Sequence, residues 1–216
     1  MNIKKYSFTL ALLLTFLVAN AQHKPFQFGF RGGLNIGWFS TEDTPFQNDG
    51  VKIGGSYGFV ADIFLMENYA FTTGFNVLYL NGNTTMTLKE GTRENQIHAR
   101  YLQLPLVFTM KTKPIREKIS LYGQIGYGLA FLLQAKRTDL LKGSDGTNEE
   151  KKVNAYDELT FTRSSLILGV GVEIPVYGST ALRAGFTFDN CFITMFKGDE
   201  FRVRNSFIDL NLALLF

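Results

Sequence analysis

The chain has 216 residues with 22 basic and 19 acidic side chains, a formal net charge of +3, and 21 residues each of Phe and Gly. Without Lys4 and Lys5 the balance is 20 basic against 19 acidic residues, so a nearly neutral chain gives no electrostatic basis for binding nucleic acid. The single cysteine, Cys191, excludes an internal disulfide.

Residues 1–21 have the three parts of a secretory signal peptide. Lys4 and Lys5 precede an apolar run of 11 residues, 8–18, and the small-residue sequence Ala19-Asn20-Ala21 follows it. The run is well short of the roughly 20 residues that a membrane-spanning helix needs. We therefore expect cleavage after Ala21. The mature domain is then 22–216, and no cysteine stands at its start to carry a lipid anchor.

The mature chain repeats a period of two that is typical of β-strands. In the first segment Phe28, Phe30 and Leu34 alternate with Gly29, Arg31 and Asn35. Pro105 cannot donate a ladder hydrogen bond, so a bulge or local break is expected there. In the fifth segment Gln124 and Gln134 fall on the polar face. The eight predicted strands are 26–38, 52–65, 69–80, 96–110, 119–134, 159–175, 180–189 and 205–216.

The connections between these segments are of two kinds. Those after the second, fourth and sixth segments are short or turn-like, at 66–68, 111–118 and 176–179. The others are longer and polar, at 40–51, 81–95, 135–158 and 190–204. Short periplasmic turns and long extracellular loops are typical of an outer-membrane barrel. We therefore predict an all-β fold, an eight-stranded antiparallel up-and-down transmembrane β-barrel.

Alternation alone fits a soluble lipocalin-like barrel or a membrane barrel with its apolar face outward. The polar face decides, because it carries many glycines and an eight-stranded barrel has room inside only for small residues beside large ones. The glycines are at positions 29, 33, 37, 54, 58, 74, 126, 128, 169, 171 and 185. Charged residues share this face and are predicted to form a lumen network. They are Arg31, Asp62, Glu173, Arg183, Asp189 and Asp209.

Aromatic residues mark both ends of the predicted lipid face. Phe26 and Trp38 lie 12 residues apart on the outward face, which is about 30 Å along the axis at ~3.3 Å per residue and a tilt near 40°. Tyr69 and Tyr79 bracket the third segment in the same way. These four residues are predicted to form the interfacial girdles of the membrane.

Several motifs resemble the PorT-like outer-membrane β-barrel family of Bacteroidetes, within the OmpA- and OmpX-like eight-stranded barrels. They spread over the mature chain: Gly32-Gly33-Leu34-Asn35, Tyr101-Leu102-Gln103-Leu104-Pro105-Leu106, Gly123-Gln124-Ile125-Gly126, Gly169-Val170-Gly171-Val172-Glu173 and Leu210-Asn211-Leu212-Ala213-Leu214-Leu215-Phe216. The mid-chain Tyr-Leu-Gln-Leu-Pro-Leu is the most specific. The resemblance implies a barrel in the outer membrane. It also implies that Phe216 is the recognition signal for the outer-membrane assembly machinery, the alternative being a merely lipid-facing residue.

Three functions remain open at this stage. The first is a non-enzymatic structural or interaction barrel with a plugged lumen, PorT-like in type IX secretion, whose partners are outer-membrane lipid, lipopolysaccharide and secretion-system proteins. The second is a narrow pore for small solutes. The third is a lipid-modifying enzyme using His98, although no local motif supports catalysis. We expect Cys191 to be inert, the charged loop 136–152 to be solvated or to contact a partner, and no cofactor or metal to be bound.

Overall fold

The computed structural model describes residues 26–42, 47–48, 50–88, 91–116, 118–143, 148–197 and 202–216. The predicted signal peptide lies outside these residues. No described segment is a helix long and apolar enough to cross a bilayer. The described strands, in chain order, are β1 (Phe26–Glu42), β2 (Gln47–Asn48), β3 (Lys52–Met66), β4 (Tyr69–Leu88), β5 (Gly91–Lys111), β6 (Ser120–Gly143), β7 (Asn148–Asn154), β8 (Thr162–Tyr177), β9 (Thr180–Cys191) and β10 (Arg202–Leu215).

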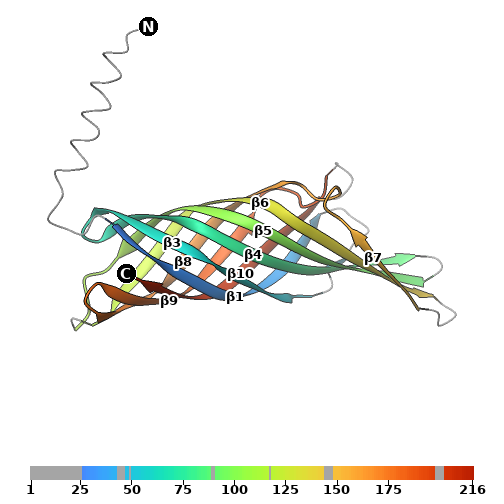
Figure 1. The fold of residues 1–216 in the computed structure, drawn as a ribbon. Coiled ribbons are helices and arrows are strands. Elements are labelled where there is room, and N and C mark those ends of the chain that lie inside the picture. Colours follow the sequence, from blue (N-terminus) through green and yellow to red (C-terminus); the bar gives the residue numbers. More distant parts are fainter. Residues whose placement is uncertain are drawn as a thin grey trace, which may run out of the picture.

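Eight of these strands close into an antiparallel meander barrel (Figure 1). The ring consists of β1, β3, β4, β5, β6, β8, β9 and β10, each paired with the next, while β2 pairs with β4 and β7 with β6. β1 pairs with β10 from Gly29↔Leu215 to Glu42↔Arg202 and closes the ring. Closure leaves no free edge in the barrel wall, which hydrocarbon would not tolerate. The predicted eight-stranded barrel is therefore confirmed.

The two faces of the wall are divided as the alternation predicted. In β1 the side chains of Phe30 and Leu34 are 64% and 66% exposed, whereas Asn35 in the same strand is 1% exposed. The same contrast holds in β3, where Ile63 is exposed and Asp62 is fully buried. Apolar side chains thus face outward toward lipid, and polar ones face the lumen.

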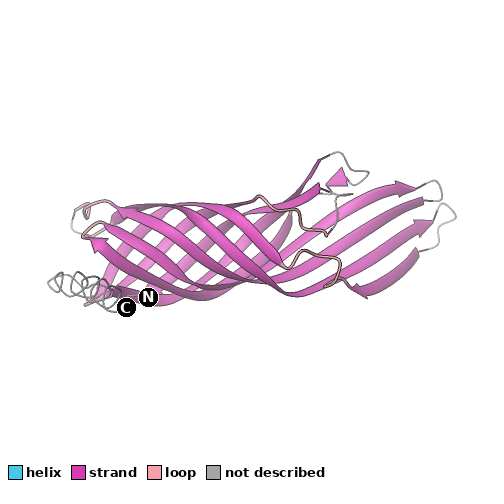
Figure 2. Cartoon of the chain, turned by 90° about the horizontal axis from the view of Figure 1, so that it is seen from above, coloured by secondary structure: helices cyan, strands magenta, loops and turns pink. Residues whose placement is uncertain are grey.

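Two of the four segments predicted as long loops, 81–95 and 135–158, are instead largely β-strand. β4 continues to Leu88 and pairs with β5 from Gly91, and β6 continues to Gly143 and pairs with β7. These four strands extend beyond the rest of the barrel at the end away from the C-terminus (Figure 2). In water a strand needs no apolar face toward lipid, so these parts of the strands lack the regular apolar alternation of the barrel wall and hydropathy does not reveal them. We call this projection the extracellular sheet.

A register shift in β6 also corrects one predicted side chain. Tyr101 pairs with Leu132 and Arg100 with Gln134, so Leu133 has no partner of its own in β5. One extra residue exchanges the two faces of the strand beyond it. Gln134, predicted on the lumen face, is therefore exposed, while Ala135 is fully buried.

The break expected at Pro105 occurs on one side of β5 only. Pairing with β4 passes from Thr72↔Val107 to Asn76↔Gln103 with no pairs between them, whereas Pro105 keeps its place opposite Gly128 in β6. The register is the same on both sides of the gap. The irregularity is therefore a local break and not a bulge.

Candidate functional site

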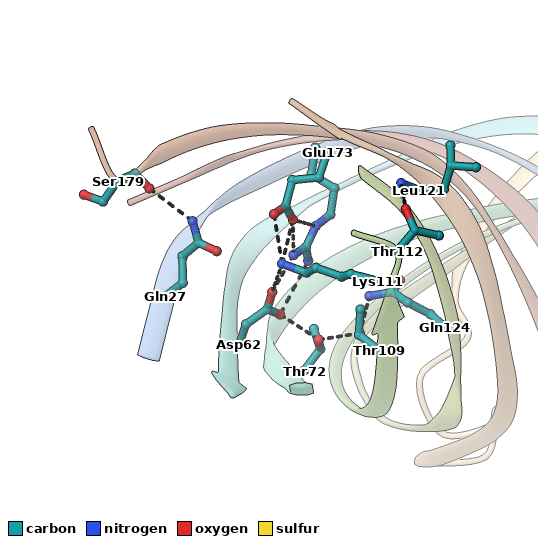
Figure 3. Close-up of polar contacts among 11 residues, drawn as sticks. Gln27, Asp62, Thr72, Thr109, Lys111, Thr112, Leu121, Gln124, Glu173 and Ser179 are labelled. Carbon is teal, nitrogen blue, oxygen red and sulfur yellow. Dashed lines mark hydrogen bonds and ion pairs between the residues drawn. The ribbon is translucent and has the colours of Figure 1, made fainter. Parts of the chain in front are cut away.

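Four charged side chains meet inside the lumen near the short turns, and we call them the periplasmic cluster. They are Asp62, Lys111, Glu173 and Arg183 from β3, β5, β8 and β9 (Figure 3 shows the first three). Lys111 Nζ lies 2.8 Å from Glu173 Oε2 and 3.6 Å from Asp62 Oδ2. Arg183 Nη2 lies 2.6 Å from Glu173 Oε2 and also pairs with Asp62. Two cations and two carboxylates leave the cluster neutral.

Hydroxyl and amide groups extend this cluster around the wall. Thr72 Oγ1 donates to Asp62 Oδ1 at 2.6 Å and lies 2.6 Å from Thr109 Oγ1, to which Gln124 Nε2 donates at 2.9 Å (Figure 3). The chain of contacts thereby reaches β4 and β6. Six of the eight barrel strands are joined across the lumen by one polar network. Such a network cross-links the barrel wall from inside.

A second neutral pair lies further along the axis. Arg31 Nη2 is 2.6 Å from Asp209 Oδ2, and Ser56 Oγ donates to Asp209 Oδ1 at 3.0 Å. Gly33 is needed beside it, because a Cβ there would lie 2.5 Å from Asp209 Oδ1. Glycine at this position makes room for the carboxylate, which is the role expected of lumen glycines in so narrow a barrel.

A third neutral pair lies nearer the extracellular end. Arg163 Nη2 is 2.6 Å from Asp189 Oδ1, and Gln103 Nε2 donates to the other carboxylate oxygen at 2.7 Å from β5. Arg163 also donates to the Asn205 carbonyl oxygen at 3.0 Å. Asp189 is 1% exposed, so its charge is fully compensated by partners drawn from several strands.

Apolar side chains close the lumen beyond these ion pairs. We call them the extracellular cap, and its buried members are Phe39, Leu78, Leu80, Ile97, Ala99, Tyr101, Ala130, Leu132, Ala135, Ala155, Leu159, Met195, Val203 and Phe207. Two connecting segments are tied across the mouth, since Thr160 N donates to the Met195 oxygen at 2.8 Å and Leu159 bridges to Phe196. A cavity of about 40 Å³ remains in the mid-lumen between Arg31, Gln103 and Asp209. That volume holds only a few waters.

All six predicted lumen charges lie in this interior, and the structure brings Asp62, Glu173 and Arg183 together. Lys111 and Arg163 belong to the same networks but were missed. Both could have been found by continuing the alternation, because Lys111 follows Thr109 by two residues and Arg163 precedes Ser165 by two. The apolar cap was not predicted as a cluster, although the alternation placed its member Tyr101 on the face of Gln103 and, continued from Asn76, also points Leu78 and Leu80 inward.

The four predicted girdle residues lie at the two ends of the outward face. Phe26 and Tyr69 begin their strands at the periplasmic end, and Tyr69 stacks on Phe108 at 5.9 Å between ring centroids. Trp38 stacks on Phe188 at 6.2 Å near the other end. Tyr79 lies beneath the guanidinium of Arg100, 4.7 Å from its ring centroid. Their contact with the membrane interfaces stays a prediction.

The remaining candidate residues lie at three separate places in the barrel. His98 is exposed, and its Nδ1 lies 2.9 Å from Asn81 Oδ1 rather than beside a serine or a carboxylate. Cys191 is buried, with Sγ 3.2 Å from the Ile193 carbonyl oxygen. The exposed ring of Phe216 lies 6.2 Å from that of Phe28, and the Phe216 backbone N–H donates to the Phe28 oxygen at 2.7 Å. A recognition role for Phe216 stays a prediction.

Comparison with known proteins identifies the family of this barrel. Residues 20–193 match the family described as outer membrane protein beta-barrel domain. No curated protein matches the chain. Among solved structures, OprG of Pseudomonas aeruginosa is 12% identical with a TM-score of 0.50 and covers 90% of this chain and 97% of its own.

Two further solved structures are similar at lower scores. Ail of Yersinia pestis is 14% identical with a TM-score of 0.41, covering 88% of this chain and 98% of its own. Neisserial surface protein A is 13% identical with a TM-score of 0.44, covering 87% and 96%. Because the family match spans most of the chain and the described strands close into a barrel with an outward apolar face, the protein belongs to the outer membrane protein beta-barrel domain family and resides in the outer membrane.

Proposed function

We propose that this protein is a non-enzymatic, non-conducting barrel that serves as a structural or interaction protein through its extracellular sheet. The filled lumen carries the proposal. Three neutral ion groups and the extracellular cap succeed one another along the axis. A solute would have to separate buried ion pairs and displace close-packed apolar side chains to pass, and both steps are costly in free energy.

The extracellular sheet supports the interaction part of the proposal. β4, β5, β6 and β7 are hydrogen-bonded side by side and continue past the barrel wall. A rigid scaffold that presents strands and turns to the outside is a common way to position binding residues. β7 carries a charged edge, with Lys151 exposed. The charge discourages non-specific strand pairing, which favours a partner selected by side chains.

A conductance measurement tests directly whether the lumen is closed. Purified protein reconstituted into planar bilayers is expected to give no steady current, while a wide porin inserted at the same protein-to-lipid ratio gives open channels. Long-lived unitary currents from the folded protein would refute the closed lumen and favour the narrow pore. Heat-unfolded protein is the control for currents caused by damaged bilayer.

Photo-crosslinking in living cells tests on which side of the membrane a partner binds. A photo-crosslinking residue replaces one position at a time. We expect an adduct from Lys151 in the extracellular sheet. Lys113 in the periplasmic turn and Ile36 on the lipid face are the matched controls. Adducts from Lys113 alone would move the interaction surface to the periplasmic side.

The resemblance to PorT-like barrels supports a narrower proposal, a role in type IX secretion. A deletion strain is expected to lose secreted cargo and to recover it with the wild-type chain. A chain shortened in β6 and β7, yet still folded, is expected not to restore it. Normal secretion in the deletion strain would refute this role and leave the closed barrel unaffected.

A further inference from the structure

Two short segments cross the extracellular mouth of the barrel, and together we call them the lid. They are residues 155–161, between β7 and β8, and residues 192–197, which follow β9. Neither segment belongs to a strand of the barrel wall. They are hydrogen-bonded to each other, since Thr160 N donates to the Met195 oxygen at 2.8 Å. The lid is therefore one unit that lies across the lumen.

One ion pair ties the middle of the lid to the extracellular sheet, and we call it the latch. Arg137 in β6 pairs with Glu158 of the lid, and its Nε lies 2.7 Å from Asp139 Oδ1 in its own strand. The Glu158 backbone oxygen accepts from Lys197 N at 2.9 Å, so the latch holds both lid segments. The Glu158 side chain is 39% exposed. Water and salt reach such a pair and weaken it.

The two ends of the first lid segment stay attached to the wall. Ala155 N donates to the Ala135 oxygen at 3.2 Å, and Leu132 N donates to the Phe161 oxygen at 2.8 Å. Both partners are in β6. The residues between these two anchors are held by the latch and by the second segment. The anchors can therefore act as hinges when those contacts separate.

The lid covers buried polar groups that lack partners. Arg163 Nε and both amide atoms of Asn205 have no hydrogen-bond partner among the described residues, although the two residues are 4% and 3% exposed. Both line a cavity of about 10 Å³ whose lining includes Thr160 and Met195 of the lid. The cavity has room for about one water. Because polar groups buried without partners lose the hydrogen bonds that water gives them, the closed lid carries a cost that opening removes.

Apolar burial opposes this cost, because Leu159 and Met195 of the lid are buried in the extracellular cap. We propose that the lid opens and closes in the folded barrel, with the latch favouring the closed state and hydration of Arg163 and Asn205 favouring the open one. Opening creates a vestibule and no channel, since the Asp209 ion pair and the periplasmic cluster still close the lumen below. Lid motion and a closed lumen can therefore fail separately.

Cys191 reports on the lid without any added residue. It is the single cysteine of the chain, it is 4% exposed, and it lines the same cavity as Arg163 and Met195. The experiment follows its reaction with a charged, water-soluble maleimide in the folded mature barrel in detergent, by mass spectrometry of the intact protein. We expect slow labelling whose rate does not change with urea below the unfolding transition, because a local opening exposes little surface. Absence of labelling, or a rate that rises steeply with urea, would overturn the lid.

The latch is tested by removing the charge of its carboxylate. Glu158→Gln is expected to speed the labelling of Cys191 at least threefold. Asp157→Asn is the matched control, because Asp157 is an exposed carboxylate of the same segment with no ion pair in the described part of the chain. Added salt is expected to speed labelling in wild type and not in Glu158→Gln. Equal rates for wild type and the folded Glu158→Gln variant would overturn the latch.

The buried polar groups are tested by a change of opposite sign. Asn205→Leu removes the amide that the closed lid leaves without a partner, while the backbone oxygen that accepts from Arg163 at 3.0 Å remains. This variant is expected to slow the labelling of Cys191 at least threefold. General loosening of the barrel speeds labelling in every variant, so a slower rate distinguishes the lid from damage. Circular dichroism checks that each variant is folded, and unchanged or faster labelling of folded Asn205→Leu would overturn the proposed balance.

Discussion

The cations inside the barrel and those on its outward face are held in opposite ways. In the lumen Arg31, Arg163 and Arg183 each lie 2.6 Å from a carboxylate oxygen, and Lys111 lies 2.8 Å from one. On the outward face Arg100 and Lys136 have no carboxylate among the described residues. The difference follows from the surroundings, since a charge enclosed by protein must be neutralised within the chain. At the membrane surface water and lipid headgroups can do so.

The lumen charges are therefore neutralised by the fold itself, whereas the outward charges can be neutralised by the surroundings. The same residue types thus have different roles on the two faces of one wall. The comparison predicts large losses of stability for changes inside and small ones for changes outside.

The largest expected effect follows removal of the most connected lumen cation. Arg183→Met leaves Asp62 and Glu173 together with only Lys111 to compensate them, and both carboxylates are largely enclosed. Breaking a buried ion pair by removing one partner costs about 3 to 5 kcal/mol. Urea unfolding in detergent or lipid vesicles is expected to show a loss of this size.

The control restores the charge balance. Replacing Arg183 with Met and Asp62 with Leu together leaves one cation and one carboxylate, Lys111 and Glu173, 2.8 Å apart. We expect this double variant to be more stable than the single one. If Arg183→Met unfolds at the same urea concentration as wild type, the cluster does not stabilise the barrel.

The sequence was sufficient to predict which face each lumen charge lies on, but not which charges pair. Alternation assigns Asp62 and Arg183 to the same face, yet 121 residues separate them and they belong to strands that are not neighbours. Their contact depends on the stagger of the closed barrel, which no local pattern records. The pair Arg31 and Asp209 shows the same limit, although there β1 and β10 are adjacent through closure.

The strand pairing at the base of the extracellular sheet was harder to predict for two reasons. It depends on an extra residue in β6, which exposes both Leu133 and Gln134 where alternation predicted one. It also depends on β7, which hydropathy had assigned to a polar loop. His98 and Lys136 are 38 residues apart and meet only through this pairing. Strands outside the bilayer lose the apolar period that made the barrel strands readable.

A smaller effect distinguishes the two leucines at the register shift. Leu132 is 2% exposed in the extracellular cap and Leu133 is 49% exposed on the outside. Leu132→Ala is expected to cost about 2 to 5 kcal/mol of unfolding free energy, as for other buried leucines. Leu133→Ala, with the same change in composition, is expected to cost less than half of that. Equal losses in urea unfolding would mean that the strand keeps strict alternation and that the division between the two faces fails here.

The smallest expected effect concerns Lys136. In detergent, Lys136→Gln is expected to change the unfolding free energy by at most ~0.5 kcal/mol, as surface substitutions usually do, because the lysine has no carboxylate partner among the described residues. Urea unfolding in detergent measures the change. A loss as large as that of Arg183→Met would place Lys136 with the fold-stabilising cations.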